Sequence, residues 1–189
     1  VAIGAVFAVP QTRAAVLDFL HLRGVSIERV PELPTTSVPT SLGYLGERVS
    51  LDEARRRADF EVVVPQSLDE PDAVYFQPAP PPGGMVSFLY GTRQHPRALF
   101  TQFAASVDDV VFKKVAPATR IDPVTIAGQP GFWIQGAHFF AYLDRRNAMQ
   151  SENVRLSGSV LLWERGTRTL RLEADVSKVE ALQIAASVD

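Results

Sequence analysis

The chain has 189 residues, 46% of them hydrophobic and 21% charged, and its formal net charge is −2. A chain of this length and apolar content can bury a core, and its balanced charge excludes attraction of nucleic acid or anionic lipid by charge alone. It contains no cysteine, which excludes disulfides, cysteine nucleophiles and thiolate metal sites.

Residues 1–9 are an apolar run without a charged or polar side chain, and a polar stretch at residues 10–13 follows. Such a run is too short to span a bilayer, which needs about 20 residues. It fits the end of a transmembrane helix that is mostly missing from this chain, the end of a signal-peptide apolar region, or a buried first strand. The polar stretch that follows favours the two membrane-derived interpretations.

Residues 10–40 are predicted to form an N-terminal piece before the main domain. A helical pattern covers residues 13–22, with Gly24 placed as a C-terminal cap. Apolar and polar residues then alternate over residues 25–30, which predicts a strand. The proline-rich residues 31–39 predict an extended linker.

Two Ser-x-x-Glu sequences predict helix starts in the main domain, residues 41–189. Ser50 and Glu53 open a short helix, and Ser177 and Glu180 open a final one. In each, the serine can accept a hydrogen bond from the glutamate amide while the glutamate reaches back to the serine amide.

The final helix is predicted to bury an apolar face made of Val179, Leu182 and Ala186. A further short helix is predicted at residues 106–114, because two acidic residues lie near its start and two lysines near its end. That arrangement complements the helix dipole, and it explains the acidic pair without a metal or catalytic role.

Most of the remaining main domain has the β-branched, aromatic or alternating residues of strands. The predicted strands are residues 60–64, 73–77, 85–90, 99–104, 124–127, 132–135, 137–143, 160–164 and 169–174. Turns are predicted at residues 128–131 and at Gly166, and Trp133 and Trp163 are assigned to the core. Short connections imply antiparallel pairing. We therefore expect an α+β fold, with one mostly antiparallel sheet built from hairpins and a few helices packed on one face.

No sequence motif for catalysis, cofactor binding or metal binding is present. The three histidines have no metal-ligand spacing, and neither a Gly-x-Ser-x-Gly sequence nor a phosphate-binding glycine loop occurs. The sequence thus predicts no catalytic, cofactor-binding or metal-binding residue, no cofactor and no enzyme activity.

One strand carries a candidate ligand or partner face. Alternation along residues 137–143 places His138, Phe140 and Tyr142 on one side, and the remaining, more apolar residues on the core side. This aromatic and partly polar stripe can line a ligand groove, or it can pack under a helix with its polar tips at the rim.

Several segments resemble the extracytoplasmic C-terminal domain of single-pass bacterial membrane proteins of the anti-sigma-factor-like type, a domain of unknown function. The matching segments are 13–20 (RAAVLDFL), 25–31 (VSIERVP), 49–54 (VSLDEA), 65–68 (PQSL), 128–134 (GQPGFWI), 161–164 (LLWE), 170–173 (LRLE) and 180–185 (EALQIA). The resemblance covers nearly all of the chain after residue 12. It implies a domain on the outer side of a membrane, anchored by an N-terminal helix, and it supplies no functional residues.

These observations together predict a non-catalytic extracytoplasmic sensor or binding domain of a membrane-anchored regulatory protein. Its expected partner is an envelope component or a protein, and not nucleic acid. The alternatives are an envelope lipid or apolar-ligand carrier, an envelope hydrolase, and a structural domain whose sheet edges or proline loops contact another protein. A fully packed sheet face would argue against the carrier, and an unpaired edge strand would favour the structural domain.

Overall fold

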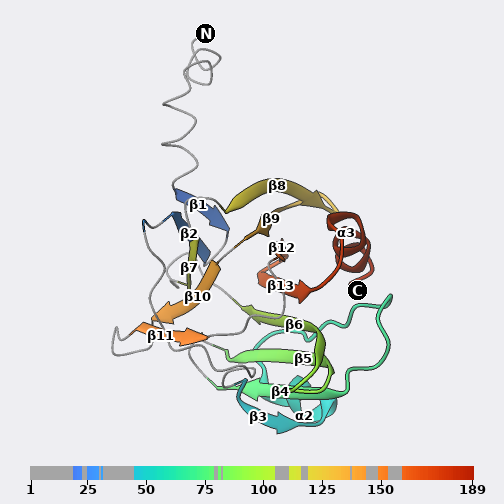
Figure 1. The fold of residues 1–189 in the computed structure, drawn as a ribbon. Coiled ribbons are helices and arrows are strands. Elements are labelled where there is room, and N and C mark those ends of the chain that lie inside the picture. The colour runs from blue at the N-terminus through green and yellow to red at the C-terminus, as the bar shows by residue number, and fades with distance from the viewer. Residues whose placement is uncertain are drawn as a thin grey trace, which may run out of the picture.

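A computed structural model describes residues 19–22, 25–29, 31, 45–78, 81, 83–104, 111–115, 119–136, 138–143, 149–152 and 159–189. In these ranges the chain forms an eight-stranded sheet, a five-stranded sheet and two short helices. Figure 1 shows the eight-stranded sheet between the five-stranded sheet on one side and helix α3 on the other.

The eight-stranded sheet is antiparallel throughout. Its strands, in spatial order, are β3 (Glu47–Val49), β4 (Ala73–Gln77), β5 (Met85–Gly91), β6 (Pro96–Ala104), β13 (Arg168–Ala174), β12 (Ser159–Arg165), β9 (Gln129–Gln135) and β8 (Arg120–Ile126). The β8–β9 turn lies at Ala127 and Gly128, whose φ angles are 50° and 79°. Positive φ at both central residues is the geometry of a two-residue hairpin turn, so the turn predicted at residues 128–131 lies two residues earlier, at residues 126–129.

The five-stranded sheet collects strands from distant parts of the chain. Its order is β1 (Phe19–Leu22), β2 (Val25–Arg29), β7 (Val111–Val115), β10 (His138–Leu143) and β11 (Met149–Glu152). Strands β2 and β7 pair in parallel, and the other pairs are antiparallel. Residues from the N-terminal piece and from the main domain are therefore hydrogen-bonded neighbours in one sheet.

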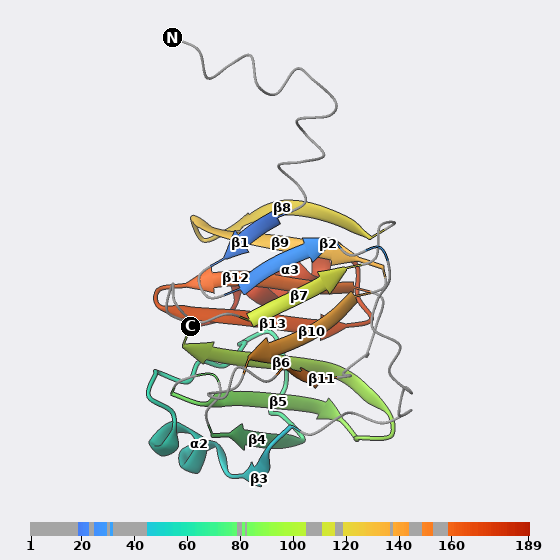
Figure 2. The same cartoon turned by 90° about the vertical axis from the view of Figure 1, so that its left-hand side faces the viewer.

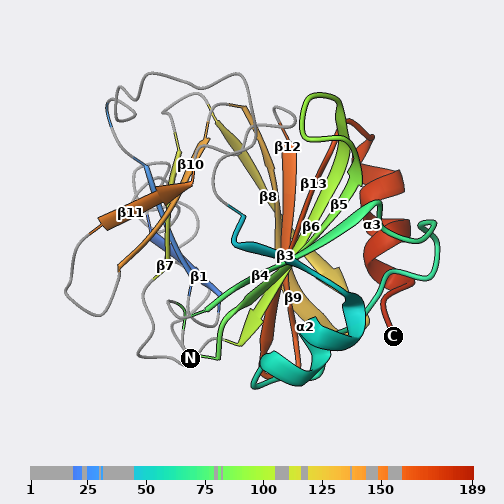
Figure 3. The same cartoon turned by 90° about the horizontal axis from the view of Figure 1, so that it is seen from below.

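The molecule has three layers, which Figure 3 shows with the larger sheet seen edge-on and its strands drawn lengthwise. The five-stranded sheet lies in front of the larger sheet in Figure 2. Ile27 of β2 is buried in a cluster with Phe103, Phe132 and Leu162 of the larger sheet. This contact fixes the smaller sheet on one face of the larger one.

The other face of the larger sheet is covered by helices α2 (Leu51–Arg57) and α3 (Lys178–Ala186) and by residues 58–68. Both predicted helix starts are confirmed, because Ser50 and Ser177 accept hydrogen bonds from the amides of Glu53 and Glu180. The Glu180 side chain returns the bond to Ser177, which completes that capping box.

A second contact holds α3 on the sheet. Lys178 Nζ lies 3.0 Å from Asp122 Oδ2 on the edge strand β8, and Arg120 Nε lies 2.9 Å from Asp122 Oδ1. Hydrogen bonds from Arg120, which has the larger effect, and from Lys178 lower the pKa of the Asp122 carboxyl below its usual range. The start of α3 is therefore linked to the sheet edge by charge as well as by packing.

The predicted fold class is wrong. The described chain is an all-β-like arrangement of two sheets with only two short helices, not an α+β fold with one sheet. Residues 111–114, expected as the end of a helix, lie in strand β7, and the end of the expected N-terminal helix is strand β1. These segments are short, and pairing with neighbouring strands overrides their weak helical patterns.

The apolar face of the last helix matches the prediction only at Leu182, which packs against the core, whereas Ala186 is exposed. The buried residues of the helix are Ala181 and Ala185, whereas Val179 is 64% exposed. Small alanine side chains allow the helix backbone to approach the sheet closely. Residues 60–64, expected as a strand, lie outside the sheets and are held by side-chain hydrogen bonds described below.

Candidate functional site

The predicted stripe of His138, Phe140 and Tyr142 lies in β10, as expected for alternate positions of one strand. Phe140 pairs with Lys113 of β7, which pairs with Ile27 of β2. The side chains of β10 lie outside the described part of the chain, so the choice between a ligand face and a packed face is still a prediction. The acidic pair near residue 108 also lies outside the described residues.

The face of the larger sheet under the smaller sheet contains buried polar side chains. Ser87, Thr101, Arg171 and Glu173 are each at most 1% exposed, and they form what we call the polar seam. The register places Ser87, Thr101 and Arg171 in one row across β5, β6 and β13. Ser87 Oγ and Thr101 Oγ1 are 3.2 Å apart, and Arg171 forms an ion pair with Glu173.

The polar seam divides the apolar side chains on this face of the larger sheet into two clusters. One cluster contains Ile27, Phe132 and Leu162, and a separate cluster contains Leu89 and Leu99. Burying a charged pair costs desolvation energy that only good hydrogen bonding offsets. The polar seam therefore favours one arrangement of the two sheets more than it favours stability.

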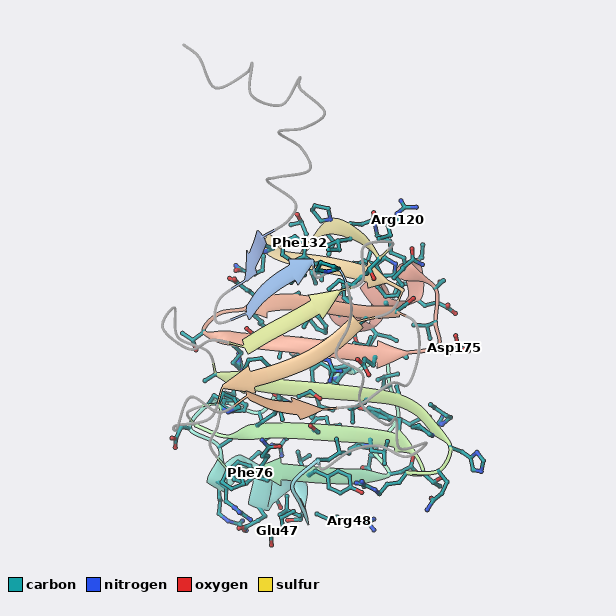
Figure 4. All side chains as sticks on the ribbon, turned by 60° about the vertical axis from the view of Figure 1, so that its left-hand side comes forward. Glu47, Arg48, Phe76, Arg120, Phe132 and Asp175 are labelled. Atoms are coloured by element: carbon teal, nitrogen blue, oxygen red, sulfur yellow. The ribbon has the colours of Figure 1, made fainter. Side chains whose placement is uncertain are left out.

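A surface hollow of about 570 Å³ lies where β3 meets α2. Its floor and wall come from the β3–α2 junction, the segment 64–72 and the start of β4. The lining residues are Arg48, Val49, Ser50, Leu51, Val64, Pro65, Gln66, Leu68, Asp69, Glu70, Pro71, Asp72, Ala73 and Val74. Figure 4 shows Arg48 and Glu47 at this end of the sheet, and Arg120 at the opposite edge.

Charged groups at the rim of the hollow hold its loops in place. Arg48 Nη2 donates to the backbone carbonyl of Asp72 over 3.2 Å, and Gly91 N donates to Asp72 Oδ2 over 2.6 Å. Arg97 Nη2 lies 3.7 Å from the same carboxylate oxygen. These contacts fix the end of segment 64–72 against β3 and the β5–β6 turn.

The start of this segment is fixed by contacts with β6 and with residues 187 and 188. The side chain of Gln102 is fully buried, and it accepts from Val63 N over 2.9 Å and donates to Val63 O over 2.8 Å. Gln66 N donates to the carbonyl of Ser187 over 3.0 Å, and Pro65 forms a β-bridge with Val188. The wall of the hollow is therefore held in a defined position before any ligand arrives.

Tyr90 lies beneath this wall. Burial and then the negative charge of Asp69 raise the pKa of the Tyr90 phenol to about 12. Its hydroxyl is buried and has no hydrogen-bond partner among the described residues. Asp69 thus lines the hollow and also acts electrostatically on the buried phenol of Tyr90.

Sequence reasoning did not predict the hollow or the polar seam. The acidic stretch at residues 69–72, which includes Pro71, was a signal for an exposed loop, and nothing in it placed β3 and α2 beside it. Alternation along β13 places Arg171 and Glu173 on the side opposite to Leu170 and Leu172, as the structure shows. What the alternation could not show is that a second sheet buries that side too.

The described ranges contain neither a candidate metal site nor a candidate membrane-spanning helix. No group of three or more His, Cys, Asp or Glu residues in them could hold a metal ion. None of the helices in the same ranges is both long and apolar enough to cross a membrane. Comparisons with protein-family models, curated proteins and solved structures return no match.

Proposed function

We propose that this chain is a non-catalytic binding domain that recognises a partner at the hollow beside β3 and α2. The observation that carries the proposal is the hollow itself, about 570 Å³ in volume, with apolar and charged lining residues. Ligand sites in proteins are commonly concavities of this size in which a few polar groups supplement an apolar surface.

The contacts of the polar lining residues favour binding over catalysis. The hydroxyl of Ser50 accepts from the amide of Glu53 over 3.1 Å, as a helix cap does. Asp72 holds Gly91 N and faces Arg97. A hydrolase needs a nucleophile beside a base, whereas these side chains position backbone. We therefore prefer a recognition role to the hydrolase alternative.

The carrier alternative has less support. An acyl chain held between the sheets would need apolar walls, but the polar seam puts Ser87, Thr101 and a charged pair on that face of the larger sheet. Because these groups lose hydrogen bonds when an apolar ligand replaces their partners, such a ligand would bind there at a cost.

The proposed location is outside a membrane, next to an N-terminal anchor. Support comes from the apolar residues 1–9 and from the resemblance to extracytoplasmic domains. Protease added to intact spheroplasts that carry the full-length protein tests this location. Digestion without detergent supports it, and protection until detergent is added contradicts it.

The binding role is tested with a library of neutral and charged fragment molecules, monitored by amide NMR shifts of the whole chain. We expect the fragment-induced shifts to concentrate at Val49, Ser50 and Leu68. A Gln66→Trp variant should suppress them, because Gln66 is an exposed lining residue that a bulky side chain can extend across. Gln183→Trp, on the exposed side of α3, is the matched control. Shifts elsewhere, or none, would contradict the proposal.

A further inference from the structure

We infer that the hollow takes an extended basic segment of a partner protein, in which a Lys or Arg side chain lies next to an apolar one. This inference rests on the proposed function, because it names the partner chemistry of the same site. Its evidence comes from the charges, the floor and the strand edge around the hollow.

The charges of the hollow favour a cation. The charged lining residues are three carboxylates, Asp69, Glu70 and Asp72, against one guanidinium, Arg48, which leaves a formal excess of two negative charges. Asp72 faces Arg97 and a backbone amide. Asp69 and Glu70 are exposed and make no ion pair within the described residues. They are thus available to a ligand that brings positive charge.

The buried phenol of Tyr90 responds to the charge of a ligand bound at Asp69. The hydroxyl oxygen of Tyr90 has an unused acceptor position within the described part of the chain, and it feels the charge of Asp69. A cation bound at Asp69 would offset the charge that raises the pKa of Tyr90 and would lower that pKa. An anionic ligand would increase it.

The floor of the hollow adds an apolar requirement. Val49, Leu51, Val64 and Leu68 line it, and each is only partly buried against the core under α2 and α3. An apolar side chain next to the cationic one would cover these groups and gain roughly 25 cal/mol for each Å² removed from water.

The strand edge favours a peptide over a small amine. β3 is an edge strand of the larger sheet, so among the described strands nothing pairs with the outer side of its backbone. Its residues Arg48 and Val49 also line the hollow. Extended peptides bind beside such edges, because main-chain hydrogen bonds add to the contacts made by alternate side chains.

The test is an NMR titration of the whole chain with the end-blocked peptide Lys-Val-Lys-Val-Lys-Val. Its counterpart Glu-Val-Glu-Val-Glu-Val and the polyamine spermidine are titrated in parallel. We expect saturable shifts at Val49, Ser50 and Leu68 with the basic peptide alone. Added salt should weaken the binding, because exposed charges are screened.

Removing the two free carboxylates provides the decisive variant. Asp69→Asn with Glu70→Gln should weaken binding of the basic peptide by about fivefold, the range expected for two exposed charge contacts. Asp175→Asn with Asp189→Asn makes the same change of charge at exposed positions outside the hollow, and it should leave binding unchanged. Figure 4 shows Asp175 well separated from Arg48.

The outcomes separate this inference from the proposed function. Equal or tighter binding of the acidic peptide, binding of spermidine alone, or an equal loss in both double variants would overturn the basic-segment inference. If fragments still shift the amides of the hollow in those cases, the proposed binding role is supported although the basic-segment inference fails. If neither the basic peptide nor any fragment shifts the hollow amides, both fail.

Discussion

The two faces of the eight-stranded sheet are buried in different ways. On the face under α2 and α3, one continuous apolar cluster includes Phe88, Phe100 and Trp163. On the face under the smaller sheet, two smaller apolar clusters lie on either side of the polar seam. Alternate residues of the same strands supply both faces, so the same backbone supports two kinds of interface.

The difference shows how each covering layer is specified. Helix α3 packs on a broad apolar surface, and its small buried residues Ala181 and Ala185 allow its backbone to lie close to the sheet. Two sheets that meet only through apolar contacts could slide, since such contacts are non-directional. Arg171 and Glu173 both lie on β13, so sliding would keep their ion pair but would place apolar side chains of the smaller sheet over its charges, which costs free energy.

The largest effect is expected from breaking the buried pair. Arg171→Met leaves the carboxylate of Glu173 buried without its cation, and we expect a loss of about 3–5 kcal/mol in the free energy of unfolding. Urea denaturation of the purified chain measures this loss.

The double variant Arg171→Met with Glu173→Leu is the companion experiment. Replacing both charges by apolar side chains should recover most of the lost stability. If the double variant is as unstable as the single one, the pair contributes directly to stability, and the specificity role proposed for it is wrong.

A matched pair of leucines compares the two faces directly. Leu161 and Leu162 are neighbours in β12 and both are fully buried, but Leu161 faces the helices and Leu162 faces the smaller sheet. Substitution of either by Ala should cost about 2–5 kcal/mol. Only Leu162→Ala should speed hydrogen exchange of the β2 and β7 amides, because it removes a contact between the sheets. Equal acceleration by both variants would contradict this division of the faces.

A smaller loss of stability is expected from a substitution where the helix-covered face meets the hollow. Gln102→Leu removes two hydrogen bonds to the backbone of Val63 and leaves the buried N–H and carbonyl of Val63 without these partners. We therefore expect a loss of about 2 kcal/mol in the free energy of unfolding. Amide exchange at Val63 should rise. Gln183→Leu, at an exposed position of α3, is the control and should change neither quantity.

The smallest effect concerns the link between α3 and β8. Arg120 and Lys178 lower the pKa of Asp122 in the folded chain. The stability that the Asp122 carboxylate contributes is therefore fully present at a pH above the pKa of an ordinary aspartate. It is lost as the pH falls through the lowered pKa of the folded chain. Thermal unfolding of the wild type and Asp122→Asn should therefore differ at neutral pH, and the difference should shrink below about pH 4. Asp175→Asn should show no such convergence. A difference that persists at low pH would exclude charge as its source.

Much of the local structure could be predicted from the sequence. Hairpins with clear turns, such as the one at Gly166, and both Ser-x-x-Glu helix starts depend on residues close in the chain. The five-stranded sheet could not be predicted, since β2 pairs with β7 more than 80 positions later, at Val25 and Val111. The polar seam escaped prediction for the same reason, because polar residues on alternate positions indicate a solvent-facing side unless a second sheet is known.

The wall of the hollow has a consequence for how this chain is made. Ser67 is held by Ser187, 120 positions further along the chain. At a ribosomal rate of 5–20 residues per second, roughly 6–24 s separate the synthesis of these two residues. During that interval the larger sheet can begin to pair while segment 64–72 has no anchor at residues 187 and 188. A nascent chain thus completes the wall of the hollow only after all strands of the larger sheet have been synthesised.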